Sequence, residues 1–173
     1  MVLGKFTNKQ GCMIGTGLTV ASIAAYSMFM PYTFLVSSTV WFSYLGVYLP
    51  MKQQSSNNTL FGAVVGALPP FIGTYAQSGM LMDIPTLLLA GYIFSWQFPH
   101  FYGILYENQV DYKKAGFVMI SDEDPTGELK AFKHMIWCNV FNTIMPCVMA
   151  LPSVGMVHPV FLVPFMYYQA INF

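Results

Sequence analysis

Long stretches without a charged residue dominate this sequence. No Asp, Glu, Lys or Arg occurs in residues 10–51, 53–82, 84–106 or 134–173. A helix that crosses a bilayer needs about 20 predominantly apolar residues. The first and last stretches are long enough for two such helices each, and the two middle stretches for one each. We therefore expect six transmembrane helices, and only 8% of the residues are charged, against about 25% in soluble domains.

The boundaries of these helices are placed where proline or polar residues interrupt the apolar runs. The expected spans are Gly11–Met30, Tyr32–Leu49, Leu60–Tyr75, Pro85–Tyr106, Met135–Leu151 and Pro159–Phe173. A transmembrane β-barrel would instead require short segments of alternating polarity, and these unbroken apolar runs favour helices. We predict an all-α fold, a polytopic transmembrane helical bundle that forms a single domain over residues 1–173.

The distribution of charges fixes the expected orientation of this bundle. If the chain crosses six times, one side carries all seven lysines, namely Lys5, Lys9, Lys52, Lys113, Lys114, Lys130 and Lys133. Basic residues gather on the cytoplasmic side of membrane proteins, so this side should face the cytoplasm or the mitochondrial matrix. Six of the seven acids lie on the same side, within residues 107–128. Asp122, Glu123 and Asp124 are expected simply to solvate a loop.

Two polar residues interrupt the fourth expected span. Gln97 and His100 lie three residues apart and should share a helical face, and Pro99 should kink the helix between them. Polar groups at this depth are costly and usually face a cavity or a partner. They could belong to a functional site, or they could form hydrogen bonds between helices.

Two carboxylates follow the fourth span. Glu107 and Asp111 are four residues apart, a spacing that places both on one face of a continuous helix. Carboxylates at the membrane edge could hold Mg²⁺ together with substrate phosphates. A solvated helix end is the alternative interpretation of the same spacing.

A lysine precedes the third span. Lys52 lies close to Asn57, Asn58 and Thr59, where this helix should begin, and helix N-termini favour anions. Lys52 could therefore bind phosphate, or it could serve only as an anchor on the positively charged side. Together with the carboxylates, these groups stand above an aromatic, apolar interior. Such an arrangement suits a substrate with a diphosphate head and a lipid tail.

Small residues and prolines shape the same span. Gly62 and Gly66 have the G-x-x-x-G spacing that lets helices approach closely. We interpret this pair as packing only. Pro69–Pro70 should end or bend the helix. His134 and His158 are interpreted as interfacial residues.

Three sequence blocks resemble one family. "YLPMKQQSSNNTLFGAVVGALPPFIG", "FSWQFPHF" and "DYKKAGFVMIS" resemble signatures of the protohaem IX farnesyltransferases, or haem O synthases, of the intramembrane aromatic prenyltransferase superfamily. The blocks occur in the family's order, and the resemblance weakens after about Lys130. It implies transfer of farnesyl from farnesyl diphosphate to a vinyl group of haem B, with Mg²⁺ holding the diphosphate, in the biosynthesis of haem A.

The resemblance implies roles for particular residues. Lys52, Asp111 and Tyr112 match catalytic positions, and Asp111 is an expected magnesium ligand. Glu107 is the second expected ligand through its spacing from Asp111, not through the resemblance. The block around Asn58 implies a substrate contact. Gln97 and His100, both in the fourth expected span, are the other expected substrate contacts. His100 could contact haem as an iron ligand or as a partner of the propionates, and both readings stay open.

The sequence also departs from the family pattern. Gln53 stands where the family carries arginine, Val110 replaces an acid, and the family's first acidic motif, N-x-x-x-D-x-x-x-D, is absent from these residues. We therefore expect a chain that is truncated at both ends and inactive by itself. The alternatives are a degenerate structural subunit of a respiratory assembly and a membrane protein that binds haem without transferring a prenyl group.

The expected partners follow from these considerations. They are farnesyl diphosphate, haem B, the lipid bilayer, and either other membrane proteins or further copies of the chain. A zero net charge and the lack of arginine argue against nucleic acid. The form "SWQFPHF" resembles mitochondrial members of the family more than bacterial ones, so we expect the mitochondrial inner membrane, with the lysine-rich face toward the matrix. A bacterial plasma membrane is the alternative.

Overall fold

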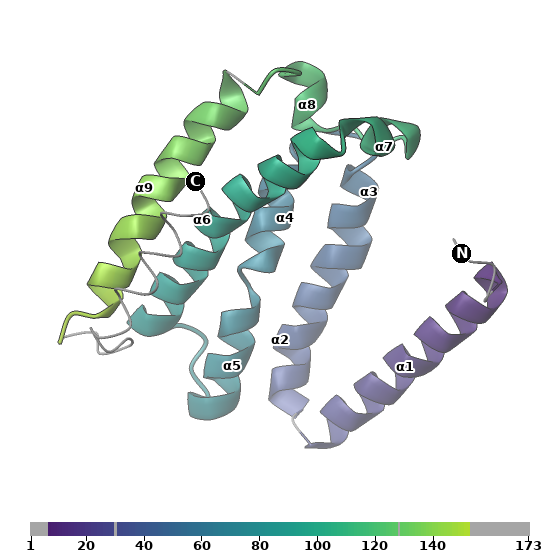
Figure 1. The fold of residues 1–173 in the computed structure, drawn as a ribbon. Coiled ribbons are helices and arrows are strands. Elements are labelled where there is room, and N and C mark those ends of the chain that lie inside the picture. Colours follow the sequence, from purple (N-terminus) through teal and green to yellow (C-terminus); the bar gives the residue numbers. More distant parts are fainter. Residues whose placement is uncertain (1–6, 30, 128, 153–173) are drawn as a thin grey trace.

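Every regular element in the described part of the chain is helical (Figure 1). The computed structural model describes residues 7–29, 31–127 and 129–152. The helices, in order, are α1 (Asn8–Phe29), α2 (Pro31–Phe42), the π-helix η1 (Ser43–Tyr48), α3 (Leu49–Met51), α4 (Asn58–Gly66), α5 (Pro69–Ser78), α6 (Ile84–Glu107), α7 (Gln109–Lys114), α8 (Ile120–Glu123) and α9 (Lys130–Met149). The predicted all-α class is confirmed for these residues.

Three helical stretches of the described chain are long and apolar enough to cross a membrane. They are Asn8–Met28, Thr33–Met51 and Asn58–Ser78, and they correspond to the first three predicted spans. The fourth and fifth predicted spans coincide with the helices α6 and α9, which are not among these three stretches. The sixth, Pro159–Phe173, lies outside the described residues. Three spans are thus supported by length and composition, and the number six stays a prediction.

The helices pack around α6. Helix α6 contacts α4, α5 and α9, whereas α1 contacts α2 and diverges from the other helices (Figure 1). A buried cluster fills the contact between α4, α6 and α9, and it consists of Ala63, Phe98, Tyr102, Leu105, Met119 and Ala131. The cluster includes Met119, which precedes α8, and Ala131 of α9. The core therefore also fixes the segment that connects α7 to α9.

The connecting segments divide between the two ends of the bundle. The α3–α4 loop, α7, α8 and the start of α9 meet at one end, drawn uppermost in Figure 1, and we call this the charged end. The α1–α2 and α5–α6 connections lie at the opposite end (Figure 1). Lys52, Lys113 and Lys130 therefore gather at the charged end, whereas Asp83 precedes α6 at the other. This agrees with the predicted separation of charges.

The glycine pair of α4 allows two side chains to approach its backbone. A Cβ atom at Gly62 would lie 2.6 Å from a ring carbon of Tyr48, and one at Gly66 would collide with the side-chain oxygen of Gln97. The packing role predicted for these glycines is therefore confirmed. The predicted break is also present, because α4 ends at Gly66 and α5 begins at Pro69.

Candidate substrate-binding site at the charged end

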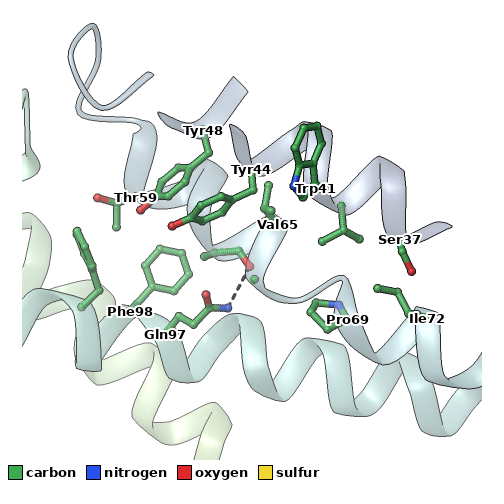
Figure 2. Close-up of a pocket in the computed structure, with 15 residues that line it drawn as sticks. Ser37, Trp41, Tyr44, Tyr48, Thr59, Val65, Pro69, Ile72, Gln97 and Phe98 are labelled. Carbon is green, nitrogen blue, oxygen red and sulfur yellow. Dashed lines mark hydrogen bonds between the residues drawn. The ribbon is translucent and has the colours of Figure 1, made fainter. Parts of the chain in front are cut away.

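An apolar cavity of about 500 Å³ lies between α2, η1, α4, α5 and α6 (Figure 2). Figure 2 shows Tyr44 and Tyr48 of η1 on one side and Phe98 of α6 on the other. The lining residues are Ser37, Val40, Trp41, Tyr44, Tyr48, Thr59, Gly62, Ala63, Val65, Gly66, Pro69, Ile72, Gln97, Phe98 and Phe101. Its size and its aromatic walls with few polar groups are typical of pockets for small apolar ligands.

Gln97 lies in the wall of this cavity. Its side-chain amide donates hydrogen bonds of 3.1 Å to the carbonyl oxygens of Ala63 on α4 and Ile93 on α6. The absence of a side chain at Gly66 makes room for the Gln97 amide. The hydrogen bond between helices that the sequence suggested for Gln97 is present, and the residue also lines the cavity. Its place in a functional site stays a prediction.

Lys52 stands at the margin of the cavity, at the C-terminal end of α3. Its Nζ atom lies 4.9 Å from the ring centroid of Tyr48 and 5.4 Å from that of Phe117. Both distances are within the range of a cation–π interaction. Tyr48 also lines the cavity. Within the described residues Lys52 forms no ion pair with a carboxylate, so its charge stands beside the apolar cavity without an anionic partner there.

The loop that carries Lys52 is bound to the segment that follows α7. The Val118 N–H donates a 2.8 Å hydrogen bond to the carbonyl of Lys52. The side-chain amide of Asn58 donates to the carbonyls of Ser55 and Val118, both at 2.7 Å. Asn58 is fully buried. Its amide therefore holds the loop and the 117–119 segment together, which positions the ring of Phe117 beside Lys52.

Tyr112 extends this aromatic margin. Its ring centroid lies 6.5 Å from that of Phe101, which lines the cavity, and 6.0 Å from that of Phe117. The structure thus brings Lys52 and Tyr112 to the same aromatic cluster. Aromatic pairs at these separations are favourable. They connect Lys52 with Tyr112, two residues to which the family resemblance assigns a role.

The expected geometry of the two carboxylates is wrong. Glu107 ends α6, Asn108 leaves the helical conformation with φ −114° and ψ 25°, and α7 begins at Gln109. The continuous helix assumed for Glu107 and Asp111 is therefore interrupted between them. Asparagine just after a helix is a common stop signal, and the side chain of Asn108 indeed donates to the carbonyl of Ile104. Asp111 is exposed and forms a 3.7 Å ion pair with Lys114.

A preassembled metal site does not occur in the described part of the chain. No group of three or more His, Cys, Asp or Glu side chains there could hold a metal ion. Glu107 and Asp111 are exposed carboxylates at the charged end. Their chemistry fits a Mg²⁺ ion that is bound by the carboxylates and a substrate phosphate together, because Mg²⁺ is commonly bound by one or two carboxylates plus phosphates.

His100 lies apart from the cavity. It is exposed, and its ring stacks on Trp96 with centroids 4.8 Å apart and planes 13° apart. It does not line the aromatic cavity, which Gln97 borders. The structure therefore does not bring His100 together with Gln97 in one site.

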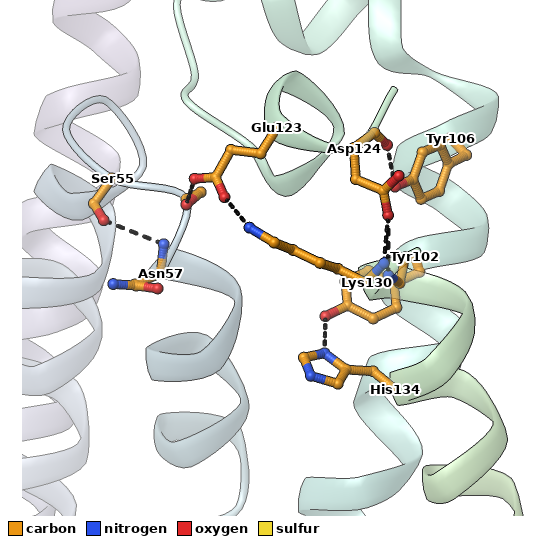
Figure 3. A network of polar contacts seen from close by, with 10 residues as sticks. Ser55, Asn57, Tyr102, Tyr106, Glu123, Asp124, Lys130 and His134 are labelled. Carbon is orange, nitrogen blue, oxygen red and sulfur yellow. Dashed lines mark hydrogen bonds and ion pairs between the residues drawn. The ribbon is translucent and has the colours of Figure 1, made fainter. Parts of the chain in front are cut away.

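Asp124 corrects the expectation that the acidic run only solvates a loop. It is 6% exposed, and its carboxylate accepts hydrogen bonds from the backbone N–H groups of Lys130, at 2.8 Å, and Ala131, at 3.3 Å (Figure 3). A carboxylate at a helix N-terminus satisfies donors that have no helical partner. These hydrogen bonds hold the pKa of Asp124 below its usual value, and the bond from Lys130 has the largest effect.

Glu123 joins two segments of the charged end. It accepts a hydrogen bond from the hydroxyl of Ser56 in the α3–α4 loop and forms a 2.8 Å ion pair with Lys130 of α9 (Figure 3). The bond with Lys130, followed by that with Ser56, lowers the pKa of Glu123. Asp122 is likewise engaged, since it accepts from the N–H of Met119 at 2.9 Å and pairs with Lys113 at 3.4 Å. The sequence showed the acids but gave no sign of these partners.

The fold and this site define a class of protein: a helical membrane protein whose aromatic cavity opens beside a cationic, polar end. The sequence profile of the UbiA prenyltransferase family matches residues 1–173, and the chain belongs to this family. Its apolar helices and its family make it an integral membrane protein.

Curated proteins named protoheme IX farnesyltransferase are similar to this chain. The chain is 38% identical to the one from Rhodopirellula baltica over 63% of the chain and 36% of that protein. It is 34% identical to the one from Geobacter sulfurreducens over 86% of the chain and 52% of that protein. The mitochondrial protein of Homo sapiens is 44% identical over 49% of the chain and 19% of its own length. The chain thus spans about half of these relatives or less, and no solved structure matches it.

Proposed function

We propose that this chain forms part of a prenyltransferase that transfers farnesyl from farnesyl diphosphate to a vinyl group of protohaem IX, giving haem O for the biosynthesis of haem A. The observation that carries the proposal is the position of Lys52, whose ammonium group lies over the ring of Tyr48 at the margin of the aromatic cavity. The family match and the names of the relatives support this choice of substrates.

In this proposal the cavity receives the farnesyl chain and the charged end receives the diphosphate. The aromatic walls bury apolar surface, which drives binding of the tail. Lys52 neutralises negative charge that develops on the diphosphate as it leaves, and such preorganised stabilisation is usually the largest part of catalysis. Asn58 acts as a positioning residue, because it is fully buried and holds the Lys52 loop. Gln97 borders the tail from α6.

Mg²⁺ belongs to this proposal as a partner of the diphosphate. Asp111 and Glu107 are the carboxylates that would hold it, and Tyr112 borders the same place through its contact with Phe117. When bound, the ion would supply charge stabilisation of the leaving diphosphate. His100 is proposed as a haem contact on the basis of its sequence block alone, because it does not line the aromatic cavity.

The proposal includes the membrane arrangement. The chain would form a single six-span transmembrane domain, part of a larger bundle, with the charged end toward the mitochondrial matrix or, in a bacterium, the cytoplasm. By itself it would be inactive, since its residues contain no N-x-x-x-D-x-x-x-D motif. The same observation, with Gln53 in place of arginine, favours the alternative of a non-catalytic membrane subunit.

Two assays separate these functions. The purified chain, given haem B, farnesyl diphosphate and Mg²⁺, should yield no haem O. The chain's segment placed within a full-length farnesyltransferase should yield haem O, and Lys52→Ala or Asp111→Asn should abolish that product. A segment that supports no transfer in this setting, although the protein folds, would favour the non-catalytic subunit. Full activity of both variants would refute the site.

A further inference from the structure

A second pocket, of about 350 Å³, lies on the opposite side of α4 from the aromatic cavity. It is formed by α4, α6, α8 and α9, and its lining residues are Ser56, Asn57, Thr59, Leu60, Phe94, Phe98, Tyr102, Ile120, His134, Trp137 and Cys138. Thr59 and Phe98 line both pockets. The two spaces are therefore neighbours with a common wall. Trp137 is 74% exposed and Leu60 52% exposed, so the second pocket opens to the surroundings between α4 and α9.

His134 has a defined orientation in this pocket. Its Nδ1 atom lies 3.1 Å from the hydroxyl oxygen of Tyr102 (Figure 3). The two rings are nearly parallel, with an interplanar angle of 19°, and the ring of Phe98 meets His134 edge-on at 6.3 Å between centroids. Tyr102 is only 2% exposed. A buried tyrosine thus fixes the imidazole, which the sequence alone suggested to be a simple interfacial residue.

This arrangement has the features of a metal-binding histidine. Metal-ligating imidazoles use one ring nitrogen for the metal and hold the other by a hydrogen bond that sets the ring orientation. When Nδ1 donates its proton to the oxygen of Tyr102, Nε2 presents a lone pair. Among the described residues no group of three or more His, Cys, Asp or Glu side chains could hold a metal ion, so this imidazole belongs to no metal site made by the protein alone. The site therefore suits a metal that already carries most of its ligands.

The rest of the pocket indicates which kind of metal complex fits. Its walls include the flat rings of Phe94, Phe98 and Trp137, and flat aromatic surfaces favour a flat apolar ligand. Ser56 and Asn57 form a polar margin at the charged end. Lys130 lies one helical turn before His134 and forms an ion pair with Glu123. A cation is therefore close to this margin. An iron tetrapyrrole with carboxylate side chains meets these conditions, and histidine is a usual axial ligand of its iron.

We infer that the pocket between α4, α6 and α9 is the haem acceptor site and that His134, held by Tyr102, is the axial ligand of the haem iron. This rests on the proposed function and assigns the position of its acceptor substrate. With the farnesyl chain in the aromatic cavity, the wall of Thr59 and Phe98 places donor and acceptor side by side. Among the described residues Thr59 Oγ1 is buried without a hydrogen-bond partner, so a polar group is available at that wall.

The test is titration of the purified chain in detergent micelles with haem B, read by the Soret band and by magnetic circular dichroism. We expect a histidine-ligated spectrum for the unaltered chain. His134→Ala should weaken haem binding by about tenfold or more and remove the imidazole signature, and Tyr102→Phe should weaken binding by about tenfold, the usual effect of losing a partner of a metal ligand. Added imidazole should restore the signature in His134→Ala.

Two controls make this result specific. Iron-free protoporphyrin IX should bind the unaltered chain and His134→Ala equally, because it needs no axial ligand. His100→Ala separates the two histidines: a partner of the propionates can change the haem affinity, but the imidazole signature should stay if His134 is the axial ligand. The same haem affinity and spectrum in His134→Ala would overturn the inference. Loss of the signature in His100→Ala alone, or failure of the unaltered chain to bind any haem, would also overturn it. Both results would leave intact the proposed transferase, of which the chain forms only a part.

Discussion

The side-chain amide of Asn58 donates a 2.7 Å hydrogen bond to the carbonyl of Val118, which lies 60 residues further along the chain. Together with the 2.8 Å bond from the N–H of Val118 to the carbonyl of Lys52, it joins the α3–α4 loop to the segment after α7. Phe117 in that segment forms part of the aromatic surroundings of the Lys52 ammonium group. The position of the proposed diphosphate contact therefore depends on a residue that the diphosphate would not touch.

Replacing Asn58 by alanine should loosen this connection. The variant removes the donor to the carbonyls of Ser55 and Val118, and the loss of buried hydrogen bonds costs about 1–3 kcal/mol. Thermal unfolding in detergent should therefore shift to a lower temperature, and the affinity for farnesyl diphosphate should fall. The control is Asn57→Ala, because Asn57 is exposed and should tolerate the change. Equal stability of the two variants would contradict the structural role of Asn58.

Replacing Gly66 by alanine should disturb the contact between α4 and α6. The added Cβ would collide with the Gln97 side chain, which must move and give up its bond to Ala63. Because the clash is with the end of a flexible side chain, the cost is mainly that of the lost hydrogen bond, about 0.5–1.5 kcal/mol. The matched control is Gly73→Ala on α5, where a Cβ meets nothing within 4 Å and alanine favours the helix by roughly 0.5–1 kcal/mol. Unfolding measurements should show Gly73→Ala to be the more stable of the two variants, and equal stability of both would count against the close approach.

The stability of the charged end should depend on Asp124 at acid pH. Hydrogen bonds from α9 lower the pKa of this carboxyl in the folded chain, relative to an unfolded value of about 3.9. Ionised Asp124 therefore stabilises the fold above the unfolded pKa, and this contribution is lost as the pH falls through the folded-state pKa. Unfolding followed from pH 7 to pH 3 should show the loss below about pH 4.

Asp124→Asn separates this effect from the other acids. The variant should be less stable than the unaltered chain near neutral pH, and its stability should change less between pH 5 and pH 3. Glu107→Gln, at an exposed carboxylate, should keep the pH profile of the unaltered chain. If Asp124→Asn kept that profile as well, the acid dependence would have to come from another group.

The sequence predicted the elements that depend on local signals. Uncharged runs marked the helices, the polar residues before Leu60 marked the start of α4, and Pro69–Pro70 marked its break from α5. Prolines and glycines act through their own backbone conformations, so their effects can be read without knowing the partner. The same reasoning identified Gly62 and Gly66 as packing positions, although not the side chains that occupy the space.

The errors concern contacts between segments far apart in the chain. The break at Asn108 separated Glu107 from Asp111, and asparagine was the signal that could have shown it. Nothing local distinguishes buried Asp124 from exposed Glu123, because burial depends on where α9 begins relative to α6. His134 is exposed, as expected of an interfacial residue, but nothing in the sequence indicated its contact with Tyr102.

Equilibrium binding of farnesyl diphosphate to the purified chain, with Mg²⁺ present, tests the central claim most directly. Farnesol serves as the ligand without a diphosphate, and Lys113→Ala, which removes a lysine paired with Asp122 at the same end, serves as the control variant. Lys52→Ala should lose about tenfold to a hundredfold in affinity for farnesyl diphosphate, because hydrogen bonds to charged groups contribute about 1.5–3 kcal/mol. Its affinity for farnesol should be unchanged. Equal binding of farnesyl diphosphate by Lys52→Ala and the unaltered chain would contradict the account.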